Sequence, residues 1–125
     1  MNARVLLAED EPSIVASLRF LLSRAGFAVE VEENGEHVVS RAIDTAPDVV
    51  VLDVMMPGID GFEALRRIRA EPRCAGLPIV MLTAKGQRED RETALRLGAD
   101  AFITKPFANA EVVEAVSRLA ARKAS

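Results

Sequence analysis

The chain has 125 residues, of which half are hydrophobic and 28% are charged. This composition is typical of one globular domain with its own core, and it excludes a largely disordered chain. The net charge of −3 gives no support for nucleic-acid binding. A single cysteine, Cys74, fits a reducing compartment. No secretory leader is apparent and no apolar run approaches the roughly 18 residues of a membrane span, so we expect a cytoplasmic protein without membrane contact.

Five short apolar runs alternate with five amphipathic segments along the chain. The segments between the runs carry apolar residues at helical spacing, as Ile14, Leu18 and Leu22 do, and Gly26 and Gly98 follow two of them as stop signals. Runs that are apolar at every position are typical of strands buried on both faces. The predicted strands cover residues 5–8, 27–31, 49–52, 79–82 and 101–104.

This alternation predicts an α/β fold with a parallel sheet covered by helices on both faces. The common arrangement is flavodoxin-like, a (βα)5 three-layer sandwich whose five strands take the order 2-1-3-4-5. Ligands bind such sheets at the carboxyl ends of the strands, near the point where the strand order reverses. The residues directly after each strand are therefore the candidates for chemistry.

Acidic residues follow the first and third predicted strands. If those strands are neighbours, Glu9, Asp10 and Asp53 lie close together, and like charges repel unless a cation separates them. Carboxylate ligands of this kind suit Mg²⁺, so we expect these residues to form a metal site. Glu11, which precedes Pro12, is interpreted instead as the cap of the following helix.

The other strand ends add the groups that phosphoryl transfer needs. Asp53 stands before a loop rich in Pro and Gly, and a carboxylate can act as a nucleophile toward phosphorus. Thr83 follows the fourth strand and Lys105 follows the fifth, so a hydroxyl and an ammonium group would face the phosphoryl oxygens. Each residue alone is commonplace, and the prediction depends on their combination.

Four segments of the chain resemble the receiver domain of bacterial two-component response regulators. The resemblance covers essentially the whole chain and implies one receiver domain over residues 1–125, which signals and is not an enzyme. It also implies that Asp53 accepts a phosphoryl group from a phosphohistidine of a sensor histidine kinase or a histidine phosphotransfer protein. The segments are VLLAEDEP at 5–12, VLDVMMPGIDG at 51–61, PIVMLTAK at 78–85 and GADAFITKPF at 98–107.

The same resemblance implies a set of metal ligands. Asp10 would bind Mg²⁺ directly, Glu9 would assist, and Asp53 and the backbone carbonyl of Met55 would complete the protein ligands. Most relatives carry Asp where this chain has Glu9. The longer glutamate side chain should still reach a water molecule bound to the metal.

A switch is implied as well. Lys105 would contact the phosphoryl group, and its bond to Pro106 is expected to be cis. Thr83 would move toward the phosphoryl group and Phe102, in place of the commoner Tyr, would turn inward. The surface formed by the fourth helix, the fifth strand and the fifth helix would then change shape and bind an unknown downstream protein.

Two positions on that surface argue against a tight dimer. Relatives that dimerise there usually carry an acid next to Asp100 and an arginine early in the last helix, where this chain has Ala101 and Ala115. Each lost surface ion pair is worth under about 1 kcal/mol, but several together weaken an interface. We expect a monomer or a weak dimer that depends on phosphorylation.

The same residues disfavour two other classes of protein. An FMN-binding protein would need a phosphate-binding loop where Glu9, Asp10 and Glu11 stand, and a phosphatase of the haloacid dehalogenase kind would need an acid at Met55. Two alternatives fit the same residues. The chain could be a receiver-like scaffold that signals without phosphorylation, or an isolated receiver fragment of a longer transcriptional regulator.

Overall fold

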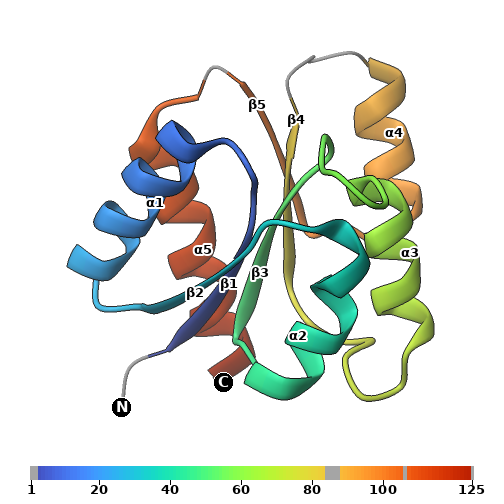
Figure 1. Cartoon of the computed structure of the whole chain (residues 1–125). Coiled ribbons are helices and arrows are strands. Elements are labelled where there is room, and N and C mark those ends of the chain that lie inside the picture. The colour runs from blue at the N-terminus through green and yellow to red at the C-terminus, as the bar shows by residue number, and fades with distance from the viewer. Residues whose placement is uncertain (1–2, 84–87, 106, 125) are drawn as a thin grey trace.

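The computed structural model describes residues 3–83, 88–105 and 107–124 (Figure 1). Strands and helices alternate as the apolar runs predict, with one 3₁₀ turn, η1, before the second helix. The strands are β1 (Arg4–Ala8), β2 (Ala28–Glu32), β3 (Val49–Asp53), β4 (Ile79–Thr83) and β5 (Ala101–Thr104). The helical elements are α1 (Pro12–Arg24), η1 (Gly35–His37), α2 (Val38–Thr45), α3 (Gly61–Ala70), α4 (Arg88–Arg96) and α5 (Asn109–Ala124).

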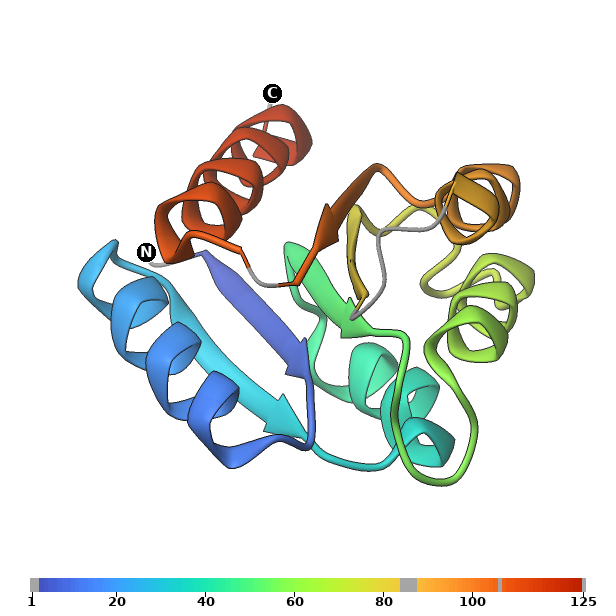
Figure 2. The ribbon, with the colours of Figure 1, turned by 90° about the horizontal axis from the view of Figure 1, so that it is seen from above.

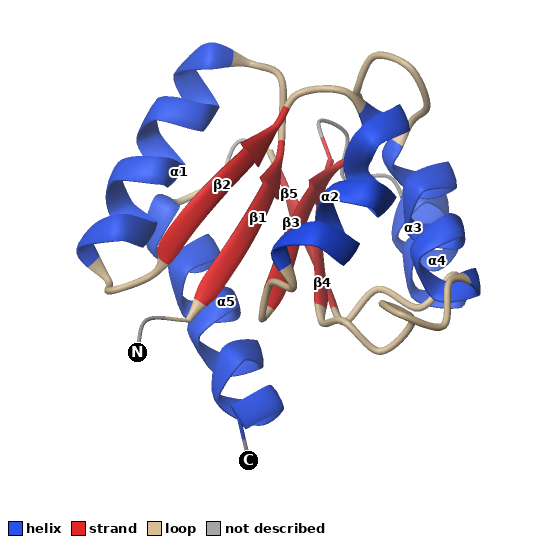
Figure 3. Cartoon of the chain, turned by 60° about the horizontal axis from the view of Figure 1, so that its bottom comes forward, coloured by secondary structure: helices blue, strands red, loops and turns tan. Residues whose placement is uncertain are grey.

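The strands form one parallel sheet in the order β2-β1-β3-β4-β5 (Figure 3). The flavodoxin-like fold predicted from the sequence is therefore confirmed. β3 and β4 are buried at every position, whereas the edge strand β2 is exposed or half-buried throughout. Because all strands run in one direction, the strand ends singled out in the sequence share one edge of the sheet.

Two apolar layers hold the sheet between its helices. α1 and α5 cover one face, while α2, α3 and α4 cover the other, as the view from above shows (Figure 2). Burial of these side chains is the main stabilising contribution. No helix in the described part of the chain is long and apolar enough to cross a membrane. The fully buried residues include Leu18, Leu22, Val116 and Leu119 on the first side and Leu65, Ile68, Met81 and Ala94 on the second.

The helix ends follow local rules with one correction. Pro12 occupies the first turn of α1, as predicted, and Gly26 follows that helix with φ +101°. Asp60 caps α3 by accepting a hydrogen bond from the Glu63 backbone N–H at 2.9 Å. Glu11 takes the predicted cap position of α1, but its side chain makes no capping hydrogen bond. That part of the interpretation was wrong, because the Glu11 carboxylate accepts the Ser13 hydroxyl at 3.5 Å and no backbone N–H of the first turn.

Candidate functional site

The register of the sheet brings the acidic residues of β1 and β3 together. Ala8 is aligned with Leu52 on the neighbouring strand, so Glu9 and Asp53 are the next residues in register. One carboxylate oxygen from each of Glu9, Asp10 and Asp53 lies within 4.8 Å of the others. Glu9 and Asp53 are buried, whereas Asp10 is exposed at the rim. The three carboxylates predicted as metal ligands thus lie in one acidic cluster.

Lys105 reaches into this cluster from the segment after β5. Its Nζ donates a hydrogen bond to Asp53 Oδ2 at 3.0 Å and lies 3.4 Å from Glu9 Oε1. Its backbone N–H donates to the carbonyl of Thr83 at the end of β4. One ammonium group therefore faces two buried carboxylates. The expected cis bond between Lys105 and Pro106 falls outside the described residues.

The carboxyl group of Glu9 is unevenly satisfied. Its Oε2 accepts the backbone N–H groups of Asp10 and Glu11, each at 3.1 Å, while its Oε1 is buried without a hydrogen-bond partner among the described residues. Burial, and then the hydrogen bond and charge of Asp53, raise the pKa of Glu9 from 4.5 to about 7. This centre holds more negative charge than Lys105 neutralises, which is the electrostatic setting that a cation relieves.

The pKa of Lys105 reflects the same excess of negative charge. Burial alone would lower the pKa of this ammonium group, but the hydrogen bond to Asp53 and the charges of Asp53 and Glu9 raise it above its ordinary value. Lys105 therefore stays protonated throughout the physiological range and can act as a fixed positive charge.

The loop between β3 and α3 begins directly after Asp53. Its first residue, Val54, donates its N–H to the carbonyl of Leu82 at 2.9 Å, and its end is closed by the Gly61 N–H, which donates to the carbonyl of Val54 at 2.8 Å. Within the loop, the Met55 N–H donates to Asp53 Oδ1 at 3.3 Å and the Met55 side chain is exposed. The backbone of Met55 thus contacts Asp53, the carboxylate beside which its carbonyl is predicted to bind the metal.

The family model for the response regulator receiver domain matches residues 5–117 of the chain. The chain belongs to this family. It is 42% identical over 112 residues to the alkaline phosphatase synthesis transcriptional regulatory protein PhoP of Bacillus subtilis, covering 90% of this chain and 46% of that protein. It is 43% identical over 119 residues to the transcriptional regulatory protein CreB of Escherichia coli, covering 94% of this chain and 51% of that protein. The receiver domain thus spans about half the length of these curated relatives.

Solved receiver domains have the same fold. The receiver domain of Francisella response regulator 1452 is 30% identical and has a TM-score of 0.88. The match covers 97% of this chain and 98% of that one. The receiver domain of sensor histidine kinase PA1611 from Pseudomonas aeruginosa is also 30% identical, with a TM-score of 0.83 covering 97% and 99%. That structure holds a magnesium ion in its active site cleft. This chain is a receiver domain of the two-component kind, which is a signalling domain.

The predicted switch residues of this receiver domain lie on adjacent strands. Thr83 is buried at the end of β4, and the half-buried Phe102 on β5 is in register with Met81, two residues before Thr83. Met81 and Phe102 pack into the same core cluster, on the side of α3 and α4. Because side chains alternate along a strand, Thr83 lies on the same face of β4 as Met81.

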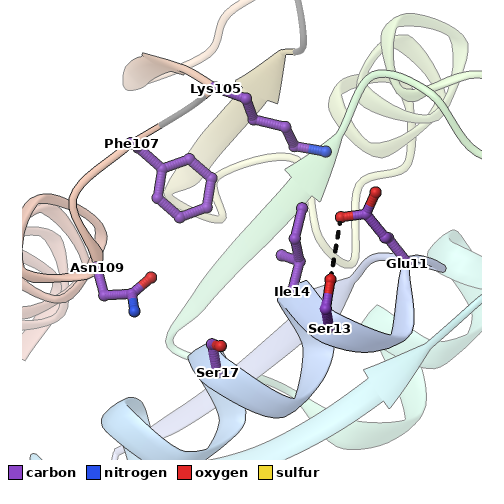
Figure 4. A pocket seen from close by; sticks show the side chains of 7 residues that line it. All are labelled: Glu11, Ser13, Ile14, Ser17, Lys105, Phe107 and Asn109. Atoms are coloured by element: carbon purple, nitrogen blue, oxygen red, sulfur yellow. Dashed lines mark hydrogen bonds between the residues drawn. The ribbon is translucent and has the colours of Figure 1, made fainter.

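An open cleft of about 460 Å³ adjoins Lys105 between α1 and the start of α5 (Figure 4). Sequence reasoning did not find it, because its walls come from opposite ends of the chain and carry no common motif. Lys105 and Phe107 lie across the cleft from Ser13, which donates a hydrogen bond to Glu11 at 3.5 Å (Figure 4). The lining residues are Glu11, Ser13, Ile14, Ser17, Lys105, Phe107 and Asn109.

Proposed function

We propose that this receiver domain accepts a phosphoryl group on Asp53 in a reaction that depends on Mg²⁺. The observation that carries the proposal is the buried carboxylate of Asp53, which Lys105 Nζ approaches to 3.0 Å beside two further acids. The donor is a phosphohistidine on a sensor histidine kinase or a histidine phosphotransfer protein. The family supports this donor class, and the cleft beside Lys105 leaves room next to the site.

Glu9, Asp10 and Asp53 would hold the metal, together with the backbone carbonyl of Met55. The donor set fits Mg²⁺, because it consists of carboxylate oxygens and includes the buried Glu9 Oε1 that lacks a hydrogen-bond partner among the described residues. The magnesium site in the PA1611 receiver domain supports the same assignment. When bound, Mg²⁺ supplies positive charge that offsets the acids and the phosphoryl oxygens.

In the transfer, a carboxylate oxygen of Asp53 bonds to phosphorus while the bond between phosphorus and the donor nitrogen breaks. The leaving imidazole keeps the electron pair, so the protein need not abstract a proton. Lys105 exchanges its hydrogen bond to Asp53 for one to a phosphoryl oxygen and stabilises the charge that spreads over the phosphoryl group. The product is an aspartyl phosphate on Asp53.

Intact-mass spectrometry after incubation with acetyl phosphate tests this proposal. We expect one added phosphoryl group in the wild type with Mg²⁺, and none with EDTA or in the Asp53→Asn variant. Because asparagine keeps the size of the side chain but is a far weaker nucleophile, the labelled fraction should fall more than about tenfold. If neither acetyl phosphate nor beryllofluoride binds with Mg²⁺ present, the domain is a scaffold that signals by binding alone.

The signal passes from Asp53 to the surface formed by α4, β5 and α5. The hydroxyl of Thr83 moves to bond the phosphoryl group, Phe102 turns into the space that becomes available, and the surface then binds a downstream protein. The shared packing of Met81 and Phe102 beside Thr83 supports this route. Active and inactive forms coexist, and phosphorylation shifts their populations.

The Thr83→Ala variant is expected to separate phosphorylation from the switch. With Mg²⁺ and beryllofluoride as the stand-in for a phosphoryl group, the wild type should shift the amide NMR signals of the Asp53 loop and of β5 and α4. The variant should keep the shifts in the loop and lose most of those at Phe102, because the hydrogen bond that drives the movement is gone. Full wild-type shifts at Phe102 in Thr83→Ala would contradict this route.

A receiver domain that controls an output domain in the same protein is a second possibility. The lengths favour it, because this chain matches only 46% and 51% of two transcriptional regulators. In that case the surface of α4, β5 and α5 would contact the attached domain instead of a separate protein. The reading frame beyond residue 125 distinguishes the two.

A further inference from the structure

The loop that carries Met55 is in close contact with the junction between β2 and α2. The two segments lie side by side in the view from above (Figure 2), and the Gly35 N–H donates to the carbonyl of Pro57 at 2.9 Å. A Cβ added to Gly35 would overlap the backbone carbonyl oxygen of Ile59. A side chain at position 35 would therefore fit only if the loop or the junction moved.

Space, not conformation, explains the glycine at this position. Three other glycines of the described chain have a positive φ, but the φ of Gly35 lies outside the left-handed region. Alanine could adopt the same backbone angles there, and the cost of the substitution comes from the contact with Ile59. Because the overlapping atom belongs to the backbone, no change of rotamer relieves it.

Side-chain contacts hold the junction between β2 and α2 in place. The Asn34 N–H donates to Glu32 Oε2 at 2.9 Å, and Asn34 Oδ1 accepts the N–H of Glu36 at 2.8 Å. Glu32 is also paired with Arg41 of α2 at 3.4 Å. These contacts hold Gly35 between β2 and α2, so we expect an added methyl group to displace the facing loop more than the junction.

The loop can absorb such a push in only one part. Its start is anchored by the bond from Val54 to Leu82, and its end is closed by the bond from Gly61 back to Val54. Asp60, which caps α3, is fixed as well. A displacement at Ile59 therefore falls on residues 55–59, where the Met55 N–H bonds Asp53 Oδ1 at 3.3 Å and the Pro57 carbonyl accepts the Gly35 N–H.

We propose that Gly35 is a positioning residue of the magnesium site, which holds residues 55–59 so that the backbone carbonyl of Met55 is placed for the metal. This inference rests on the proposed function, since it assumes that the acidic cluster binds Mg²⁺. It adds a residue that contacts the loop at Pro57 and Ile59 and is itself none of the proposed metal ligands. Metal affinity then depends on how β2 and α2 are joined.

The chain offers a selective probe of the Met55 carbonyl. Met55 and Met56 form the only Met–Met peptide in the sequence. In protein labelled with methionine that carries ¹³C at its carbonyl and ¹⁵N at its amide, only the Met55 carbonyl is bonded to a labelled nitrogen, and its signal is split. Titration with Mg²⁺ then follows this one carbonyl, while calorimetry measures the affinity.

The decisive comparison is Gly35→Ala against Gly76→Ala. A Cβ on Gly76 meets nothing within 4 Å, so that variant controls for the loss of a glycine. We expect Gly76→Ala to bind Mg²⁺ like the wild type, and Gly35→Ala to bind about tenfold more weakly with a smaller shift of the Met55 carbonyl at saturation. Urea unfolding of each variant shows that the folded protein is being compared.

Asn34→Ala keeps the test open if Gly35→Ala does not fold. It removes the side-chain acceptor of the Glu36 N–H without adding an atom to the contact, and we expect a weaker effect in the same direction. Wild-type affinity and a full Met55 shift in Gly35→Ala, or in Asn34→Ala should the first not fold, would overturn the proposal. A wild type that binds no Mg²⁺ would instead overturn the proposed function on which it rests.

Discussion

Replacement of Glu9 with glutamine is expected to stabilise the metal-free protein by about 3 kcal/mol at about pH 8. The pKa of Glu9 is raised from 4.5 to about 7 by burial and by Asp53, so the folded state disfavours the ionised carboxylate. Between these two values the folded protein holds a proton that the unfolded chain has released. Stability therefore falls as the pH rises through this window, and above it the full cost is present.

Glutamine removes that cost while keeping the shape of the side chain. Its amide oxygen can still accept the backbone N–H groups of Asp10 and Glu11, which bond Glu9 Oε2 at 3.1 Å. In the variant, the part of the pH dependence of stability that comes from Glu9 should disappear. The variant should also lose most of the stabilisation by Mg²⁺, because one of the three carboxylates is gone.

Urea unfolding at about pH 5 and about pH 8, with and without Mg²⁺, measures both effects. Glu114→Gln is the matched control, since the Glu114 side chain is 70% exposed on α5 and should change neither quantity. Two results would contradict the prediction: a metal-free wild type that is equally stable at both pH values, or a Glu9→Gln protein that gains as much from Mg²⁺ as the wild type.

The fold could be predicted because two features of the sequence indicate it: the apolar runs and their alternation with amphipathic helices. The runs at 49–52 and 79–82 are short and apolar at every position, which is typical of strands covered on both faces, and β3 and β4 are such strands. The alternation with amphipathic helices then leaves the parallel order β2-β1-β3-β4-β5 as the common arrangement. The strand ends carry the acids, so their proximity follows from the register alone.

The details of the site could not be read from the sequence, because they depend on packing between distant segments. The sequence Glu9-Asp10-Glu11 does not reveal which of the three acids is buried. In the structure Glu9 is buried and Glu11 is exposed. Gly35 looks like an ordinary turn residue until Ile59 is seen against it. In both cases the deciding neighbour is set by tertiary structure.

Replacement of Lys105 with methionine is expected to have the opposite effect to the change at Glu9. It should destabilise the metal-free protein by about 3 kcal/mol at about pH 8, because it leaves the buried carboxylates of Asp53 and Glu9 without their cation. The loss should be smaller at about pH 5. Without the lysine charge the pKa of Glu9 rises further, and the protonated acid no longer needs a partner.

Arg118→Met on α5 is the control for removal of a positive charge. Arg118 is paired with Glu114 at 3.5 Å in an exposed i,i+4 pair, which is worth under about 0.5 kcal/mol. Urea unfolding should therefore separate the two variants clearly. A Lys105→Met protein that loses no more stability than Arg118→Met would contradict the view that the lysine neutralises a buried pair.

The double variant Glu9→Gln with Lys105→Met decides whether the two groups act on one another. If Lys105 neutralises both acids, its removal costs less once Glu9 is already neutral, and the two changes are not additive. Additive changes would mean that Lys105 acts on Asp53 alone, with which it shares the shorter contact.

Opposite effects of the two single replacements have one physical explanation: the acidic cluster of the folded protein holds more negative charge than Lys105 balances. Such a centre costs stability in the metal-free protein, and this cost is recovered when a cation binds.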